Sequence, residues 1–295
     1  MSWSLVAVKS GSRIRTAALA HDGSIHEIDI LPANITPIDV MRNWAEYGET
    51  LRDWDIGGSP TLADVAIDQP LRFPNKLICI GANYRDHRAE MSADAEGAKA
   101  RPFFFLKPPT TALIGPGEPI SIRSEADRVD WEAEIAIVIG KGGRFIKKED
   151  ALGSIAGITL ANDISARGVH HQPDAVAPPF SYDWLASKAQ DGFCPLGPGI
   201  LPIWFVDDVE DVPFSLSVNG EQQQSSTTAY TVTSVLDQVV AASEWMTLEP
   251  GDVILTGTPA GVGAARGLSL KDGDEVVVSS PLIGDLANRV QVIGR

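Results

Sequence analysis

Cysteine, basic residues and long hydrophobic runs are scarce in this 295-residue sequence. Its two cysteines, Cys79 and Cys194, sit in apolar surroundings, which excludes a disulfide framework or a zinc cluster and suits a reducing compartment. No apolar run approaches the roughly 20 residues of a membrane span, and the first residues lack the apolar core of a signal peptide. Lys and Arg number 24 against 39 Asp and Glu, a net charge of −15 that repels phosphate backbones and anionic lipid. We therefore expect a cytoplasmic protein that binds neither nucleic acid nor membranes.

Three common catalytic signatures are also missing. The glycine-rich segment 256–263 lacks the Gly-Lys-Ser/Thr ending of a phosphate-binding loop. The sequence has no Gly-x-Ser-x-Gly elbow and no His-Glu-x-x-His helix, so it lacks the motifs of a serine hydrolase of that type and of a zincin. The glycine-rich segment follows an expected strand, where its amides could face an anion or could simply form a tight turn.

Residues 1–70 form the first of two expected units. Its β-type runs are residues 2–8, 13–20 and 24–30. Thr36 has the character of a helix N-cap with Pro37 at the first helical position, and Gly57 begins the pair of glycines that stops the helix. The unit contains no cluster of reactive side chains, which favours a scaffold or dimer-packing role.

Residues 75–295 form the second expected unit, in which short strands dominate. The expected strands are residues 77–81, 103–106, 131–139, 157–161, 214–218, 253–256 and 275–279, and the clearest helix is 231–246. Because strands and helices do not alternate regularly, a doubly wound parallel sheet is disfavoured. The sequence predicts an α+β fold that is mainly β.

The most informative segment is the run Asp130-Trp131-Glu132-Ala133-Glu134 and the apolar residues that follow it. In a β-strand Glu132 and Glu134 point to the same face, about 7 Å apart at their backbones. Both faces are otherwise apolar, which is typical of a strand covered on both sides. Buried like charges are costly unless a cation neutralises them or one stays protonated, and a hard divalent ion is the simplest solution. Two solvated glutamates at an exposed strand end are the alternative.

Asp163 weakens that alternative. It follows the apolar run 157–162, and enough chain separates it from Glu134 for a turn at 141–143, a short helix near 149–154 and a return strand beside the first. Three carboxylates from adjacent strands could hold Mg²⁺ or Mn²⁺ and leave positions open for water and substrate.

A second constellation contains His87 and Glu90, which are i,i+3 neighbours if their segment is helical. A carboxylate beside an imidazole fixes its tautomer and raises its basicity, as activation of a water by a general base requires. A pair of solvated side chains on a charged helix is the alternative.

Taken together, these segments resemble the fumarylacetoacetate hydrolase family, and in particular its two-domain, acylpyruvate hydrolase type. The matching motifs occur in the family's order across residues 75–290: Ile80-Gly81-Ala82-Asn83-Tyr84 to His87 and Glu90, Phe105-Leu106-Lys107-Pro108, Asp130-Trp131-Glu132-Ala133-Glu134, Asn162-Asp163-Ile164-Ser165-Ala166-Arg167, Ser187-Lys188, Phe193-Cys194-Pro195-Leu196-Gly197-Pro198, Val218-Asn219-Gly220-Glu221, Pro250-Gly251-Asp252 and Thr256-Gly257-Thr258-Pro259.

The resemblance implies a mixed β-sandwich roll with a small N-terminal α/β domain, and a homodimer. It implies a divalent metal held by Glu132, Glu134 and Asp163. It also implies a water-activating pair of His87 and Glu90 on a mobile lid, for which the polar composition of residues 84–100 is suited.

The resemblance further implies that Lys188 stabilises developing oxyanion charge and that Thr258 holds a substrate carboxylate. The remaining substrate contacts that it implies are Tyr84, Arg167, His170 and Gly257. His170 is a departure, because relatives often carry Gln at this position, and an exposed loop is the alternative for this histidine.

We therefore predict a Mg²⁺- or Mn²⁺-dependent hydrolase of aromatic catabolism that cleaves a C–C bond in a small 2,4-dioxo acid, such as an acylpyruvate or fumarylpyruvate. The alternative is an isomerase or decarboxylase of a 2-oxo acid, similar to 2-hydroxyhepta-2,4-diene-1,7-dioate isomerase or oxaloacetate decarboxylase. A non-catalytic relative that binds an acid is a third possibility. The pair of His87 and Glu90 favours hydrolysis, because it can activate the water that attacks the distal carbonyl. The pair also argues against the third possibility, because a protein that only binds an acid has no use for it.

Overall fold

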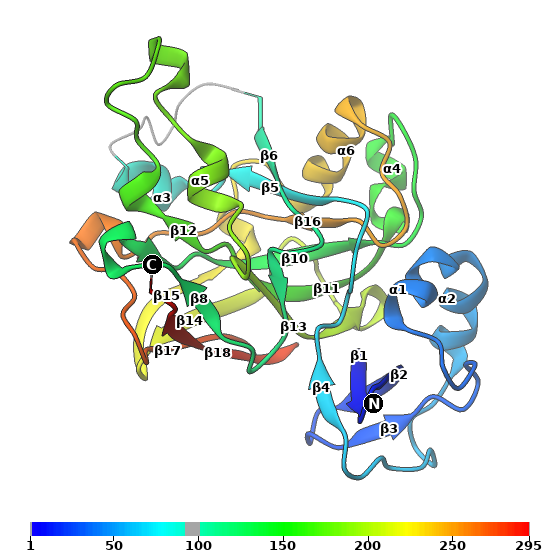
Figure 1. Ribbon diagram of the computed structural model, residues 1–295. Helices are drawn as coiled ribbons and strands as arrows, with labels where there is room; N and C mark the ends of the chain where they lie inside the picture. The colour runs from blue at the N-terminus through cyan, green and yellow to red at the C-terminus, as the bar shows by residue number, and fades with distance from the viewer. Residues whose placement is uncertain (1, 92–100, 295) are drawn as a thin grey trace.

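The computed structural model describes residues 2–91 and 101–294, and its largest feature is a mixed sheet of eleven strands (Figure 1). In chain order these are β1 (Trp3–Ser10), β2 (Arg13–Ala20), β3 (Ile25–Glu27), β4 (Ala66–Asp68), β5 (Leu77–Gly81), β6 (Phe103–Lys107), β7 (Leu113–Ile114), β10 (Ala133–Ile139), β11 (Ile155–Asn162), β13 (Cys194–Pro202) and β16 (Val253–Leu255). The main path through the sheet is β3-β2-β1-β13-β11-β10-β16-β5-β6, while β4 pairs with β1 and β7 with β13.

A second sheet of five strands lies against the centre of the first within the described residues. Its members are β8 (Ile120–Ile122), β14 (Pro213–Val218), β15 (Glu221–Thr227), β17 (Glu275–Ser280) and β18 (Gly284–Val292), in the order β15-β14-β17-β18-β8. A short pair consists of β9 (Val129–Asp130) and β12 (Ser165–Ala166). The largest core cluster joins the two sheets through residues such as Ile135, Ile158, Leu216 and Val278. The predicted α+β, mainly β fold is confirmed.

Burial along the strands explains this two-layer arrangement. Every residue of β10 and β11 is buried, so these strands are covered on both faces as the apolar run around Glu134 predicts. The strand β17 alternates between buried and half-buried residues and therefore covers the core with one face only. Three long strands, β13, β15 and β18, lie outside the predicted set.

The helices are short and lie at the margins of the sheets (Figure 1). They are α1 (Pro37–Arg42), α2 (Trp44–Asp53), α3 (Arg85–Glu90), α4 (Lys148–Ala151), α5 (Trp184–Lys188) and α6 (Val235–Trp245). Single 3-10 turns lie at Glu125–Asp127, Leu152–Ser154, Arg167–Val169, Pro178–Phe180, Ile203–Phe205, Thr228–Tyr230 and Ala264–Arg266. In the described part of the chain, each helix is too short or too polar to cross a bilayer.

Two helix predictions need correction. The single helix expected after Pro37 is divided into α1 and α2 at Asn43, whose backbone leaves the helical region at φ −113° and ψ 31° and whose side chain donates to the carbonyl of Asp39 at 2.9 Å. The helix expected from residue 231 starts at Val235, because the side chain of Ser234 caps it by accepting from the amide of Asp237. Local side-chain hydrogen bonds set both boundaries.

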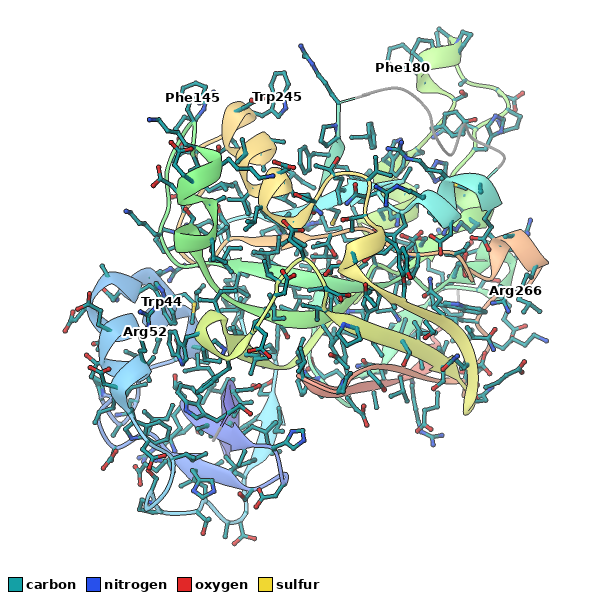
Figure 2. All side chains as sticks on the ribbon, turned by 180° about the vertical axis from the view of Figure 1, so that it is seen from behind. Trp44, Arg52, Phe145, Phe180, Trp245 and Arg266 are labelled. Atoms are coloured by element: carbon teal, nitrogen blue, oxygen red, sulfur yellow. The ribbon has the colours of Figure 1, made fainter. Side chains whose placement is uncertain are left out.

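The N-terminal segment joins the rest of the molecule through the large sheet. Strand β1 pairs with β13 at Leu5 and Ile200, although the segment projects to one side in Figure 1. Trp44 of α2 stacks on Trp204 with ring centroids 5.7 Å apart, and Arg52 lies over the same Trp204 ring at 5.4 Å (Figure 2). The division into units 1–70 and 75–295 stays a prediction, and this paired strand and aromatic stack connect the two segments.

Candidate active site

Three carboxylates meet where two central strands pair. Strands β10 and β11 are antiparallel, with Ala133 opposite Asn162, so Glu132 at the start of one lies beside Asp163 at the end of the other. The amide of Asp163 donates to the carbonyl of Glu132 at 2.8 Å, and the amide of Glu132 donates to the Asn162 side chain at 2.9 Å. One carboxylate oxygen each of Glu132, Glu134 and Asp163 lie within 4.8 Å of one another. The antiparallel register therefore assembles the acidic cluster that the sequence predicts.

Two buried lysines neutralise part of this cluster. Lys188 of α5 places Nζ 2.8 Å from Glu132 Oε2 and 2.7 Å from Asp163 Oδ2. Lys107 of β6 pairs with the other oxygen of Asp163 and donates to the carbonyl of Ile164 at 3.0 Å. Burial opposes the charge on Lys188, but the Asp163 and Glu132 carboxylates outweigh it and raise its pKa. Lys107 has no role predicted from the sequence, although it lies two residues beyond Phe105 on β6 and therefore on the same face of the strand.

Arg167 forms ion pairs with Asp130 and Glu132 beside the cluster. The guanidinium Nε lies 3.1 Å from Asp130 Oδ2 and Nη2 lies 2.5 Å from Glu132 Oε1. Burial alone would raise the pKa of Glu132, but Lys188 and Arg167 hold it well below its usual range. Asp130, a residue without an assigned role in the sequence analysis, therefore orients the arginine that fixes one metal-ligand candidate.

Glu134 differs from its two neighbours. Its Oε2 accepts a hydrogen bond of 2.5 Å from the amide of Gly257, and no salt bridge to it is found among the described residues. Burial, followed by the negative charges of Asp163 and Glu132, raises its pKa well above the usual value. A divalent cation among the three carboxylates would supply the missing positive charge. The donor set, three buried carboxylates, is the oxygen-only chemistry that Mg²⁺ and Mn²⁺ favour.

His87 and Glu90 on α3 form the second constellation. Their side chains meet at 3.1 Å between Nδ1 and Oε2, which is the i,i+3 contact expected from their spacing. The other oxygen of Glu90 accepts from the amide of Gly261 at 3.0 Å. Burial would raise the pKa of Glu90, but the hydrogen bonds from His87 and Gly261 outweigh it and lower this pKa. Glu90 is thus an anion that orients the imidazole, and His87 is only 6% exposed.

The glycine-rich segment 256–263 does bind anions, and these are the protein's own carboxylates. Amides of Gly257, Gly261 and Gly263 donate to Glu134, Glu90 and Asp130 respectively. Gly257 has φ +91°, and a Cβ there would lie 2.7 Å from Asn83 Cβ, so both the backbone and the space require glycine. One loop therefore holds three acidic residues of the site in place.

Thr258 of the same loop is already hydrogen-bonded. Its hydroxyl donates to the carbonyl of Ala133 at 2.9 Å and accepts from Gln224 Nε2 at 2.9 Å. A hydroxyl has one hydrogen, so contact with a substrate carboxylate would require this donor bond to open. Gln224 of β15 also accepts from the amide of Ala133 at 2.9 Å, which makes it a supporting residue that the sequence analysis did not identify.

A cavity of about 350 Å³ opens onto these groups. Its lining residues are Ile80, Gly81, Ala82, His87, Met91, Phe103, Phe105, Glu132, Asp163, Arg167, Trp184, Lys188 and Thr258. The helices α3 and α5 lie near one another at this end of the large sheet, next to β5 and β6 (Figure 1). The cavity thus brings the carboxylates, Lys188 and His87 together from elements that are far apart in the sequence.

The implied substrate contacts divide into two groups. Arg167 and Thr258 line the cavity, whereas Tyr84, His170 and Gly257 lie outside its lining. Tyr84 is fully buried and packs edge-on against Phe214, with ring centroids 6.2 Å apart. The ring of His170 packs edge-on against Trp184, with ring centroids 4.8 Å apart. Most of the lid expected over residues 84–100 falls at 92–100, outside the described residues; the part before it contains α3.

Comparisons with known proteins agree on one family. The family described as "Fumarylacetoacetate (FAA) hydrolase C-terminal" matches residues 76–291. Oxaloacetate tautomerase FAHD2A, mitochondrial, from Bos taurus is 39% identical over 230 residues, which cover 77% of this chain and 70% of the relative. Fumarylacetoacetate hydrolase from psychrophilic Exiguobacterium antarcticum has a TM-score of 0.81 and 32% identity, covering 99% of this chain and 100% of that one. Maleylpyruvate hydrolase from Sphingobium sp. SYK-6, in complex with manganese(II) ion and pyruvate, has a TM-score of 0.78 and 28% identity, with 99% and 100% covered.

Proposed function

This chain belongs to the fumarylacetoacetate hydrolase family, as its series of motifs predicts, and we propose that it is a divalent-metal-dependent hydrolase of a small 2,4-dioxo acid of the acylpyruvate type. The observation that carries the proposal is one cavity lined by Glu132 and Asp163 of the carboxylate cluster, by Lys188 and by His87, whose ring is bonded to Glu90. A similar hydrolase in complex with manganese(II) ion and pyruvate supports a divalent metal and a 2-oxo acid as ligands.

Glu132, Glu134 and Asp163 would hold the Mg²⁺ or Mn²⁺ ion. When bound, such an ion supplies positive charge that orients the 2-oxo acid and lowers the energy of the enolate. Lys188 adds its ammonium beside the same carboxylates. Negative charge develops on the carbonyl oxygens in this reaction, and its stabilisation is usually the largest catalytic contribution, so pre-positioned cations are the expected catalytic device.

His87 acts as the general base in the proposed reaction. Because Nδ1 is bonded to the Glu90 carboxylate, the proton is held there, and Nε2, which has no hydrogen-bond partner among residues 2–91 and 101–294, can accept another. His87 takes a proton from water, and the resulting hydroxide forms a bond to the 4-oxo carbon of the substrate. The bond between carbons 3 and 4 then breaks, and its electron pair moves into the enolate of pyruvate. His87 returns the proton to carbon 3, giving pyruvate and a carboxylic acid.

Tautomerisation of oxaloacetate is the second candidate. The similarity to proteins named oxaloacetate tautomerase favours it. In that reaction a proton moves between carbon 3 and the oxygen on carbon 2, with no attack by water. The His87–Glu90 pair could carry this proton as well, so the two reactions use the same residues and differ in whether a water is positioned beside His87.

The test is a product assay on a panel of acylpyruvates and oxaloacetate. Each compound is assayed with Mg²⁺, with Mn²⁺ and after dialysis against EDTA. Hydrolysis releases pyruvate and an acid, whereas tautomerisation changes only the enol absorbance. Metal-dependent pyruvate release from an acylpyruvate supports the first proposal, and enol–keto conversion alone supports the second. Full activity in EDTA, with no metal found by elemental analysis, would contradict both.

A further inference from the structure

The cavity beside the carboxylates has two unlike walls. One wall carries the charged groups Glu132, Asp163, Arg167 and Lys188. Much of the other wall is aromatic: Phe103 and Phe105 from alternate positions of β6, and Trp184 from the first turn of α5. Side chains two apart on a strand point to the same face, so β6 presents both phenylalanines to the cavity.

The three rings form one platform. The centroid of Trp184 lies 5.0 Å from Phe103 and 5.1 Å from Phe105, with tilts of 44° and 37° between the ring planes. Phe103 is 50% exposed, so part of a large apolar ring stays uncovered where a ligand would lie. Covering such a surface with a flat apolar group is favourable, because aromatic rings gain both burial and oriented ring contact.

Trp184 is held in place from behind. The ring of His170 packs against it edge-on, with centroids 4.8 Å apart, and His170 Nδ1 is 3.1 Å from the hydroxyl of Ser187. Tyr182 packs against His170 in turn at 5.3 Å. Asp183 caps α5 by accepting from the amide of Ala186 at 2.8 Å. His170 is therefore a positioning residue for Trp184, and the platform requires little rearrangement on binding.

The charges of the cavity argue against a second carboxylate on the substrate at this wall. Among the described lining residues, the lysine and arginine side chains are Lys188 and Arg167, and both are engaged by Glu132 and its acidic neighbours. The face of an aromatic ring is electronegative, and a carboxylate buried without a partner loses several kcal/mol of hydration.

We infer that the acyl end of the substrate is planar and apolar, as in an aroylpyruvate, and that Phe103, Phe105 and Trp184 select it over an acyl end that carries a carboxylate. This inference rests on the proposed function, since it takes the 2-oxo acid end to lie at the charged wall. It separates this chain from a maleylpyruvate hydrolase or an oxaloacetate tautomerase, whose named substrates carry two carboxylates.

The test measures binding of 2-oxo acids that lack the 4-oxo group and are therefore not cleaved. Isothermal titration of the Mn²⁺-loaded protein compares 2-oxo-4-phenylbutanoate with 2-oxoglutarate. We expect the phenyl compound to bind more tightly by roughly tenfold or more, the usual effect of filling an apolar pocket. Trp184→Ala should remove most of this preference, and Trp184→Phe should keep most of it because the platform remains aromatic.

A second platform variant and a control variant test whether the binding preference comes from the aromatic rings. Phe103→Ala, at a half-exposed position, should reduce the preference without endangering the fold. Trp245→Ala is the matched control, because Trp245 is 57% exposed at the end of α6, on the outer surface (Figure 2), and should leave the ratio of dissociation constants unchanged. Tighter binding of 2-oxoglutarate, or an unchanged ratio in both Trp184→Ala and Phe103→Ala, would overturn the inference.

The same preparation is assayed for turnover of aroylpyruvate, fumarylpyruvate and oxaloacetate. Turnover together with a preference for the dicarboxylates overturns this inference and leaves the proposed 2-oxo acid chemistry intact. Failure to turn over any of these acids, together with failure to bind either analogue, counts against the proposed function and this inference together. A lower KM for aroylpyruvate than for fumarylpyruvate, lost in Trp184→Ala, supports both.

Discussion

Lys188→Met is expected to destabilise the metal-free protein by about 3 kcal/mol. The ammonium lies 2.8 Å from Glu132 and 2.7 Å from Asp163, and the lysine side chain is 4% exposed. Methionine keeps the apolar part of the lysine side chain, but it leaves the Glu132 and Asp163 carboxylates buried without the ammonium of residue 188. Removing one partner of a buried ion pair costs about 3–5 kcal/mol, because the remaining charge stays desolvated. Lys107 still contacts Asp163 and Arg167 still contacts Glu132, so the lower end of that range applies.

Thermal unfolding in EDTA and with added Mn²⁺ measures this effect. One kcal/mol corresponds to roughly 2–4 °C for chains of 150–250 residues, so a loss of about 3 kcal/mol should make the Lys188→Met protein melt about 6–12 °C below the unmodified protein in EDTA. A bound ion stabilises by about 2.7 kcal/mol at a hundredfold excess over its Kd. Because the substitution leaves more negative charge in the cluster, Mn²⁺ should raise the Tm of the variant more than that of the unmodified protein.

Lys148→Met is the matched control. Its ammonium pairs with Asp237 at the surface, where the two side chains are 56% and 46% exposed, and such pairs contribute at most about 1 kcal/mol. The control should melt close to the unmodified protein and respond to Mn²⁺ in the same way. The reasoning is refuted if Lys188→Met in EDTA melts with the control, or if Mn²⁺ stabilises the variant no more than the unmodified protein.

Three further predictions concern the base, the metal and the loop. His87→Ala should lower kcat for an acylpyruvate roughly 10²–10⁴-fold, because His87 acts as the base in the reaction. The affinity for oxalate, measured by calorimetry, should stay nearly unchanged, because oxalate binds at the carboxylate cluster. Undiminished hydrolysis would refute the role of His87. Glu134→Gln removes a clustered carboxylate and should weaken Mn²⁺ binding roughly tenfold or more by isothermal titration, and an unchanged Kd would place the ion elsewhere. Gly257→Ala should lower the free energy of unfolding in urea by about 1–3 kcal/mol or more, since φ is +91° and the Cβ would meet Asn83. Gly273→Ala, at φ +83° with open space around the Cβ, is the matched control, and an equal loss in both variants would exclude crowding as a cause.

The strands that periodicity can identify are those with a regular apolar pattern. Strand β10 and its neighbour β11 are buried throughout, and their apolar runs predicted both the pairing and the place of Glu134 and Asp163. Strand β13 has the sequence CPLGPGILP, in which proline and glycine ordinarily mark a turn. Its glycine at 199 is needed because a Cβ there would lie 2.7 Å from the side chain of Val6 on β1. The close approach of β13 to β1 therefore outweighs the turn preference of proline and glycine. This approach is a tertiary contact that the local sequence does not indicate.

Strand β15 was not predicted because its residues are polar. Strand β15 reads EQQQSST and lies at the edge of the second sheet, so no apolar alternation marks it. Yet Gln224 is 2% exposed and bonds to Ala133, Thr258 and the carbonyl of Pro259. Gln224 supports the site only because the loop at Thr258 contacts it in the folded protein, and Thr258 is 34 residues away in sequence. Contacts of that kind carry no local sequence signal.

The choice between hydrolysis and tautomerisation depends on the surroundings of His87 more than on the carboxylate cluster. Both reactions place negative charge on the oxygen at carbon 2, so Lys188 and a bound ion would help each of them equally. Hydrolysis also needs a water between His87 and carbon 4, and that carbon lies toward the aromatic wall if the 2-oxo acid end meets the charged wall. A flat acyl group resting on Trp184 would fix the orientation of carbon 4, whereas oxaloacetate has no apolar acyl group to rest on the rings. The aromatic platform and the histidine base therefore favour the same reaction, cleavage of an acylpyruvate, although either one alone would be compatible with both.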